Sequence, residues 1–220
     1  MSDLAKKMSR QTIILGLAMR PENEHGCTQE DLIDLFGVES ATIQRDLKDL
    51  RFEGIIIGSR RRKGIRYEAG LDEQQALRYI STFAGLTLRH PSVDKATALT
   101  VQRHGVKALY MFVALQQSIE QKLRIHIEYE KSAKEIKKRV VEPVDLFVNE
   151  GQWRLLAREN SLVKQYLLVK ILSITETTES FRPADGDELS LFKNSWGSWM
   201  GPEEYNVKLH FDLERSAYIR

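Results

Sequence analysis

The sequence predicts an α+β protein in which a helical N-terminal third is followed by further helices and then by a strand-rich segment. In residues 8–19, 28–37 and 40–54, apolar side chains recur at helical spacing. From Leu123 to Glu130, apolar and polar residues alternate strictly, as in a strand with one buried face. Residues 55–69 combine β-branched residues with a basic turn, which favours a hairpin.

The composition is that of a folded protein and excludes a disordered chain. Of 220 residues, 42% are hydrophobic and 29% are charged, and 33 basic residues nearly balance 31 acidic ones. No apolar run is long enough to span a bilayer. The N-terminal MSDLAKKMSRQ lacks the apolar stretch of a secretion signal, and the single cysteine cannot form an internal disulfide. We therefore expect a cytoplasmic protein.

The first 70 residues predict three helices and a hairpin. Thr28 is placed to cap the second helix, with Asp31 in its first turn, and Gly37 can end it in a left-handed conformation. Ser40 is expected to cap the third helix, and Gly54 to end it. Helix, helix, tight turn, helix and hairpin is the order of a winged helix-turn-helix.

The third helix and the hairpin supply the candidate DNA contacts. The helix face opposite Ile43, Leu47 and Leu50 carries hydrogen-bond donors suited to phosphates and base edges. No acidic residue lies between Gly58 and Tyr67, so the hairpin tip is strongly basic. The residues we expect to bind DNA are Thr28, Ser40, Thr42, Gln44, Arg45, Lys48, Arg60, Arg61, Arg62, Lys63 and Arg66. A basic loop alone is as often merely solvated, so the prediction rests on the whole ordered set.

The third helix and the following strand, ESATIQRDLKDLRFEGII, resemble the recognition helix of DeoR-type regulators. The resemblance is carried by Ser40, Thr42, Arg45, Asp46, Leu47, Leu50, Gly54 and Ile55. In that family, the threonine and the arginine at the places of Thr42 and Arg45 face DNA. The resemblance covers roughly the first third of the chain.

The middle of the chain predicts two helices, over residues 71–85 and from about 106 to 121, with His90 and Pro91 between them. They are interpreted either as a linker packed on a neighbouring domain or as a dimerisation surface. Both would bury an apolar face. We favour dimerisation and expect a homodimer, because operators read by such modules are usually two-fold.

Residues 122–183 predict several short strands, a pattern typical of a small barrel or sandwich. KSAKEIKK is expected to form a polar loop, and Asn149–Gly151 a turn. Pro143 places its strand at an edge or a bulge. QYLLVKILSITETTESF predicts two more strands or one long bent strand.

This segment resembles a WYL domain in the order Tyr129, Arg139, Glu142–Pro143, Gly151–Gln152–Trp153–Arg154–Leu155, Tyr166 and Lys170–Ile171. The resemblance implies a small Sm-like or SH3-like β-barrel that binds a regulatory ligand, often a nucleotide or nucleic acid. A winged helix is its usual N-terminal partner. The ligand site is then expected to include Tyr129, Arg139, Trp153, Arg154, Lys164, Tyr166 and Lys170.

The name-giving triplet departs from the family pattern, because Arg154 stands where the family has tyrosine. Arginine keeps a planar group that can stack and grip phosphate. Lys170 stands where arginine is usual, and Tyr166 where phenylalanine is frequent. By strand phase, Trp153 belongs to the core, whereas Arg154 could instead face solvent.

Catalytic or metal-binding patterns are missing from the sequence. No two histidines, and no histidine with Cys27, have the spacing of metal ligands, and there is no P-loop, GxGxxG or GxSxG. We therefore expect no enzyme, no cofactor and no metal. Cys27 precedes the expected cap Thr28, where a helix N-terminus could lower the pKa of its thiol.

The predicted organisation is a winged helix over residues 1–70, a helical linker or dimerisation segment over 71–121, a WYL ligand-sensing domain over 122–183, and a linker with the start of a C-terminal extension over 184–220. In the last part, Val207, Leu209 and Phe211 alternate as a strand, with a helix beginning after Glu214. The predicted function is a sequence-specific DNA-binding transcription regulator, with repression favoured. The alternatives are an RNA- or single-strand-binding protein using an Sm-like barrel, and a module whose winged helix binds protein.

Overall fold

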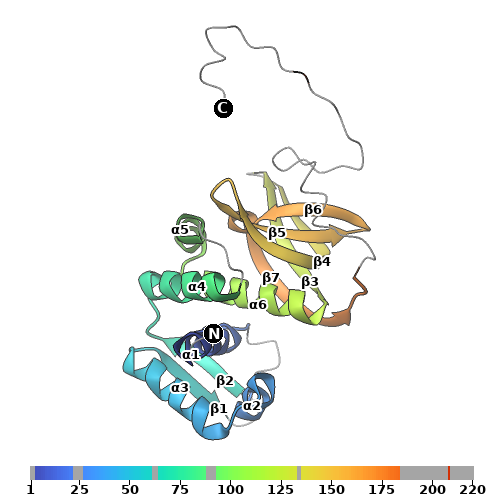
Figure 1. Ribbon diagram of the computed structural model, residues 1–220. Helices are drawn as coiled ribbons and strands as arrows, with labels where there is room; N and C mark the ends of the chain where they lie inside the picture. The colour runs from blue at the N-terminus through green and yellow to red at the C-terminus, as the bar shows by residue number, and fades with distance from the viewer. Residues whose placement is uncertain are drawn as a thin grey trace, which may run out of the picture. The chain divides into compact units, whose positions relative to one another are not determined.

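The computed structural model describes residues 3–21, 27–60, 64–87, 93–132 and 135–183, together with Lys208. The described helices and strands belong to one compact unit, Met1–Pro183. In chain order this unit has a helical region with a two-stranded hairpin, further helices, and a five-stranded sheet (Figure 1). The predicted α+β class is confirmed. The strand and helix expected in residues 207–220 fall outside the described part of the chain, apart from Lys208.

The N-terminal region has the predicted order of elements. These are α1 (Asp3–Ala18), α2 (Gln29–Phe36), α3 (Ser40–Phe52), β1 (Ile56–Arg60) and β2 (Gly64–Ala69). Apolar residues from each helix and from the hairpin meet in a common core, among them Ile14, Leu32, Leu47 and Ile65. Burial of this core holds the short helices together, because isolated helices of such length are marginal in water.

The residues at its two ends explain where α2 begins and ends. The Thr28 hydroxyl accepts from the Asp31 N–H at 3.1 Å, and the Asp31 carboxylate accepts from the Thr28 N–H at 2.7 Å, which completes a capping box. Gly37 ends the helix at a φ of 59°.

The prediction that Ser40 caps α3 is wrong. Ser40 is the first helical residue and Glu39 is the N-cap, without a side-chain hydrogen bond.

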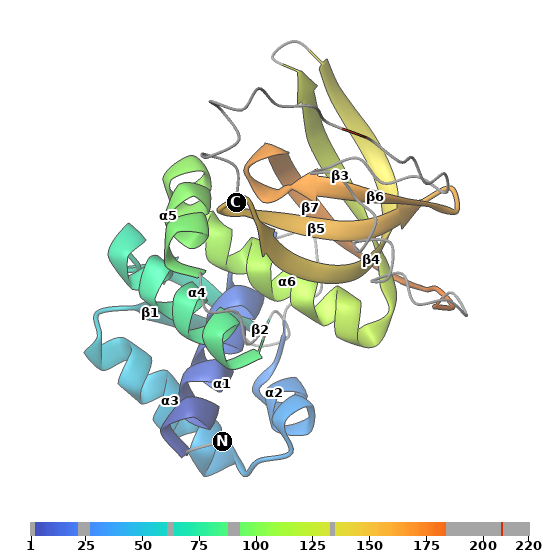
Figure 2. The same ribbon diagram turned by 45° about the horizontal axis from the view of Figure 1, so that its top comes forward.

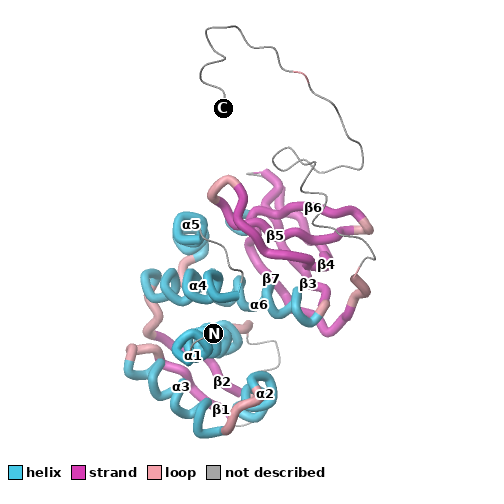
Figure 3. The backbone as a smooth tube through the Cα atoms, in the orientation of Figure 1, coloured by secondary structure: helices cyan, strands magenta, loops and turns pink. Residues whose placement is uncertain are grey.

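Three helices follow the hairpin: α4 (Glu73–Thr87), α5 (Val93–His104) and α6 (Lys107–Gln121). The sequence predicted α4 and α6 but not α5. Apart from Val101, its buried side chains are small or polar, as in Ala96, Thr97 and Thr100, so they do not produce an apolar stripe. The predicted interruption at His90 and Pro91 lies outside the described residues. Figure 3 distinguishes the helices α1–α6 from the hairpin strands β1 and β2 and from the strands of the larger sheet.

The strands β3 (Leu123–Ser132), β4 (Glu135–Asn149), β5 (Gln152–Glu159), β6 (Leu162–Leu167) and β7 (Ile171–Ser180) form one antiparallel sheet. A 3₁₀ turn, Leu168–Lys170, separates the last two strands, so of the two alternatives for this segment the structure has two strands and not one long bent strand. The strand order is β6-β5-β4-β3-β7. Because β6 and β7 are the two edges of this order in the described chain, the sheet is not closed, and the predicted barrel is not confirmed.

Three local predictions for the sheet have different outcomes. Pro143 lies at a register shift between β4 and β5, so the predicted bulge is confirmed. The segment KSAKEIKK is mostly strand rather than loop, because β3 extends to Ser132 and β4 begins at Glu135. The turn predicted at Asn149–Gly151 is confirmed by the positive φ of Glu150 and Gly151, 51° and 70°.

Helices α5 and α6 cover one end of the sheet. Trp153 of β5 packs edge-on against Phe112 of α6 with ring centroids 5.1 Å apart, and its Nε1 donates to Thr97 of α5 at 3.0 Å. In Figures 1 and 2, α6 lies between the N-terminal helices and the sheet. On its other side, Gly16 of α1 approaches Val113 so closely that an added Cβ would lie 2.4 Å from the Val113 Cβ. The winged-helix region and the sheet therefore share α6 as a common support.

Candidate nucleic-acid interface and anion site

Helix α3 separates its apolar and basic residues onto two faces. Ile43, Leu47 and Leu50 are buried against the N-terminal core. Arg45 and Lys48, predicted to bind DNA, are exposed on the opposite face. Arg51, one turn further along, is also exposed and was missed by the sequence analysis. The i, i+3 spacing from Lys48 would have found it.

The acidic residues of α3 are paired with basic residues of α1. Asp46 is buried and accepts from Nε of Arg10 at 2.6 Å and from its Nη2 at 3.2 Å. Asp49 pairs with Lys7, whose Nζ is 2.7 Å away. These pairs neutralise the carboxylates that would otherwise oppose a phosphate backbone. The exposed face of α3 thus keeps its positive charge, as a groove-binding helix requires.

The remaining predicted DNA-binding residues are in varied settings. Gln44 and Ser40 are exposed and hydrogen-bonded to each other at 3.5 Å, and Thr42 is half-buried. The Thr28 hydroxyl is engaged in the capping box, whose hydrogen bonds lower the pKa of Asp31. Residues 61–63 lie outside the described chain, and only the backbone of Arg60 is described. Contacts from the hairpin tip therefore stay a prediction.

Arg66 is turned toward α1 rather than placed with the basic face. Its Nη1 donates to the carbonyl oxygens of Arg20 and Pro21, at 2.8 and 3.3 Å. These carbonyls follow the last turn of α1, where a cation is favoured by the helix dipole. The geometry indicates that Arg66 fixes the hairpin to α1, which disfavours the predicted DNA contact.

Arg20 then connects this region to the sheet. Its Nε and Nη2 donate to the Glu176 carboxylate of β7 at 2.8 and 2.7 Å. The Tyr110 hydroxyl of α6 reaches the same carboxylate at 3.4 Å. A bidentate arginine–carboxylate pair fixes orientation as well as distance. The end of α1, helix α6 and strand β7 are therefore tied together at one carboxylate.

Four of the predicted ligand-binding residues lie together around one carboxylate on the sheet. Nη1 of Arg139 is 2.6 Å from both oxygens of Glu159, and Nζ of Lys164 is 2.5 Å from Oε2. The Tyr166 hydroxyl donates to the same Oε2 at 3.2 Å. The Tyr129 and Tyr166 rings meet edge-on at 5.1 Å. We call Tyr129, Arg139, Glu159, Lys164 and Tyr166 the anion cluster.

The anion cluster brings together residues from four strands. Tyr129 of β3 and Tyr166 of β6 meet although β4 and β5 lie between their strands, so the sheet is strongly curled. The Arg139 guanidinium also lies over the Tyr166 ring, 5.9 Å from its centroid. Glu159 was missed by the sequence analysis. It follows Trp153, Leu155 and Ala157 in strand phase, so the alternation pattern would have placed it on the same face.

The charges of the anion cluster alter the acidity of its members. Burial alone would raise the pKa of Glu159, but hydrogen bonds and attraction from Arg139 and Lys164 outweigh it and lower that pKa to about 2. Burial and the Glu159 charge raise the pKa of Tyr166, despite the opposing Arg139. Glu159 is therefore ionised and Tyr166 neutral at physiological pH.

The other predicted ligand residues lie elsewhere. Trp153 is 1% exposed and packs in the core, as its strand phase predicted, so its ring cannot stack on a ligand without rearrangement. Arg154 is 4% exposed, which corrects the reading of it as a solvated residue. Its guanidinium reaches Glu150 at 2.7 Å and Gln165 at 3.3 Å. Lys170 is half-buried on the 3₁₀ turn before β7.

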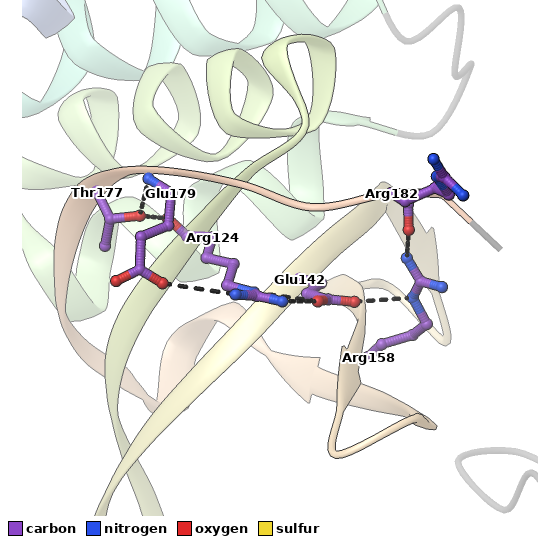
Figure 4. Close-up of polar contacts among 6 residues, drawn as sticks. All are labelled: Arg124, Glu142, Arg158, Thr177, Glu179 and Arg182. Atoms are coloured by element: carbon purple, nitrogen blue, oxygen red, sulfur yellow. Dashed lines mark hydrogen bonds and ion pairs between the residues drawn. The ribbon is translucent and has the colours of Figure 1, made fainter.

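A second arginine–carboxylate group lies near the end of β7 (Figure 4). Glu142 accepts from Arg124 at 2.9 Å and pairs with Nε of Arg158 at 3.2 Å. Arg158 also donates to the carbonyl of Arg182 at 2.8 Å. Arg124 further pairs with Glu179 at 3.5 Å. These bonds join β3, β4, β5 and the segment after β7, which is a structural role.

Cys27 does not have the environment of a reactive thiol. Burial and the Asp31 charge raise its pKa to about 11, although Arg20 acts in the opposite direction. Burial therefore outweighs any lowering of the thiol pKa by the nearby helix N-terminus. Within the described ranges, no group of three or more histidine, cysteine, aspartate or glutamate residues is arranged to hold a metal ion. No helix described here is long and apolar enough to cross a membrane.

Comparison with known proteins identifies two domains. Residues 17–66 match the family model of an HTH domain, and residues 111–176 match that of the WYL domain. The predicted resemblance to a WYL-domain regulator with an N-terminal helix-turn-helix is thus confirmed. This combination supports a DNA-binding transcriptional regulator. None of the curated proteins compared with the chain matches it.

Among solved structures, the chain is similar to proteasome accessory factor B/C (PafBC) of Arthrobacter aurescens, with 15% identity and a TM-score of 0.31. The match covers 80% of this chain and 33% of that chain, so this chain spans about a third of the length of PafBC.

Proposed function

We propose that this protein is a cytoplasmic, sequence-specific transcription regulator that binds operator DNA as a homodimer through the exposed face of α3. The observation that carries the proposal is the separation of charge on this helix. Arg45 and Lys48 are exposed, while Asp46 and Asp49 are paired with α1. Residues of these types at the surface of a recognition helix suit contacts to guanine edges and phosphates.

The strand-rich part is proposed to sense a nucleotide or nucleic-acid-like ligand at the anion cluster and to change the affinity for the operator. Two basic side chains and two tyrosines from three strands meet there, which suits a phosphate-bearing ligand. Repression is favoured over activation, because occluding a promoter needs no further contact surface. Arg60, Arg61, Arg62 and Lys63 at the hairpin tip are proposed to follow the phosphate backbone.

Fluorescence anisotropy with a duplex from upstream of the protein's own gene tests the proposal. The same salt series is run with a scrambled duplex and with single strands. Arg45→Ala is expected to weaken operator binding about 10- to 100-fold, the effect of losing one specific base contact. Arg103→Ala is the matched control, because Arg103 is an exposed arginine on α5 that pairs with Glu130. It should leave binding unchanged.

Each alternative has its own result. Equal loss of binding in the Arg45→Ala and Arg103→Ala variants would mean that bulk charge alone attracts DNA, and would contradict a reading role for α3. A preference for single strands, with Arg139→Ala as damaging as Arg45→Ala, would move the main nucleic-acid site to the sheet. In the proposed division of labour, Arg139→Ala keeps basal duplex binding and loses the response to ligand.

A further inference from the structure

Three donor groups converge on one oxygen of the Glu159 carboxylate. Arg139 and Lys164 approach it at 2.6 and 2.5 Å, and the Tyr166 hydroxyl at 3.2 Å, with all three directed at Oε2. Among the described residues, the same Nη1 of Arg139 donates to Oε1. Here a single carboxylate oxygen accepts from all three donors. A tetrahedral anion has three or four oxygens and would divide the same donors among them.

Arg139 retains donor capacity despite this ion pair. Both bonds to Glu159 come from Nη1, and Nε is buried with no hydrogen-bond partner in the described part of the chain. Phosphate groups are typically gripped by two parallel N–H groups of the guanidinium. Glu159 engages only one guanidinium nitrogen of Arg139, so a phosphate group that took the place of the carboxylate could engage Arg139 with more donors than Glu159 does.

The formal charges of the anion cluster do not balance. Arg139 and Lys164 carry two positive charges, and Glu159 carries one negative charge. The Glu159 side chain is 11% exposed and that of Arg139 18%, whereas Lys164 is 39% exposed and marks the side open to solvent. A phosphate monoester, with close to two negative charges, would match the two cations better than one carboxylate does.

We propose that Glu159 is an intramolecular counter-anion that holds the place of a ligand's phosphate group and must be displaced when the ligand binds. The inference rests on the proposed ligand-sensing function of the anion cluster and adds its regulation. Glu159 thereby lowers the affinity of the anion cluster for every ligand, because a ligand has to compete with a carboxylate that is already held beside Arg139 and Lys164. A weakly charged molecule would not displace it.

Isothermal titration calorimetry of the full chain with thymidine 5′-monophosphate tests this idea, with thymidine and inorganic phosphate as comparisons. Glu159→Gln keeps the size of the side chain and removes its charge, so the affinity for the monophosphate should rise at least about tenfold. The further change Arg139→Ala in the same chain should abolish that binding. Glu159→Asp keeps the charge but draws it back by one methylene, and an intermediate affinity is expected.

Glu142→Gln is the matched control for the loss of a negative charge. Glu142 also bridges two arginines on the same sheet, Arg124 and Arg158, outside the anion cluster (Figure 4). Its substitution should leave the monophosphate affinity within about twofold of the unsubstituted chain. An equal gain in both glutamine variants would show an effect of net charge alone, and would overturn the proposal. If Glu159→Gln fails to fold by circular dichroism, Glu159→Asp decides, and no gain over the unsubstituted chain overturns the proposal.

Two further arms separate this inference from the proposed function. Operator binding is measured on the same samples, and a ten-nucleotide single-stranded oligothymidylate is titrated beside the monophosphate. If Glu159→Gln binds neither phosphate probe more tightly but the operator is still bound, the inference fails and the regulator stands. If the phosphate affinity rises while no variant binds the operator, the inference stands and the regulator fails. A gain confined to the oligothymidylate, or to the monophosphate, identifies which phosphate source fits the anion cluster.

Discussion

The close approach of α1 and α6 at Gly16 predicts that a single methyl group will destabilise the protein. The Cβ added by Gly16→Ala would lie 2.4 Å from the Val113 Cβ, and 2.5 and 2.7 Å from its two methyl carbons. Ordinary carbon contacts are about 3.5–4.0 Å, so the helices must separate by roughly 1 Å. No rotamer of Val113 relieves the contact, because its Cβ is fixed to the backbone of α6.

The magnitude follows from two opposing effects. Overpacking of a core costs about 1–3 kcal/mol, and alanine in place of a helical glycine returns about 0.5–1 kcal/mol. The net expectation for Gly16→Ala is a loss of about 1–2 kcal/mol of unfolding free energy. For a unit of this size, that lowers Tm by about 2–8 °C, which thermal unfolding followed by circular dichroism would measure.

Gly85→Ala is the control for this prediction. Gly85 lies in α4, is exposed, and has no atom within 4 Å of the position of an added Cβ. At this position only the gain from replacing a helical glycine by alanine remains, so Gly85→Ala should stabilise the protein by about 0.5–1 kcal/mol. Opposite signs for the two substitutions are the expected result. If Gly16→Ala also stabilises, the helices are not in the tight contact described, and the reasoning is refuted.

Three further predictions concern buried charge and pH. Asp46→Asn leaves the Arg10 guanidinium without its counter-charge and should cost about 2–4 kcal/mol in urea unfolding; a loss below 1 kcal/mol would contradict it. The folded pKa of Glu159 lies near 2, below its ordinary value of 4.5, so its contribution to stability is present above about pH 4.5 and falls as the pH drops toward 2. Unfolding midpoints from pH 5 to 3 should decline more steeply in the unsubstituted chain than in Glu159→Gln, and parallel declines would disprove this. Burial lowers the pKa of His104, whose Nε2 lies 3.1 Å from the Leu168 carbonyl, so stability should fall as the pH drops below about 6.5, and His104→Gln should remove that part of the decline.

Much of the N-terminal region could be predicted from the sequence, because its elements are specified by local signals. Thr28, Gly37 and Gly54 mark helix ends by backbone and capping preferences that do not depend on the rest of the fold. Helix α5 could not be found in this way. It buries Ala96, Thr97 and Thr100, and such small residues are selected by the closeness of the sheet rather than by hydrophobicity.

The two candidate sites also differ in how far the sequence could predict them. Arg45 and Lys48 follow from the period of one helix, so the sequence places them correctly on its exposed face. The position of Arg66 depends on the carbonyl of Arg20, which follows α1 and is 46 residues earlier in the chain. Glu159 gains its role only because the curl of the sheet brings β3, β4 and β6 around it. Contacts between distant segments carry no sequence period, and charged residues on a strand are ordinarily assumed to face water.

The geometry also indicates how the two parts of the chain could influence each other. Arg66 of β2 binds the carbonyls at the end of α1, and Arg20 at that end binds Glu176 of β7. Strand β7 pairs with β3, where Tyr129 of the anion cluster is opposite Ile171. In the proposed ligand-sensing function, a ligand that displaced Glu159 would act on β3, which pairs directly with β7. Coupling would require that β7 has two positions and that the ligand prefers one of them; Arg20 would then carry that preference to α1 and so to the face of α3.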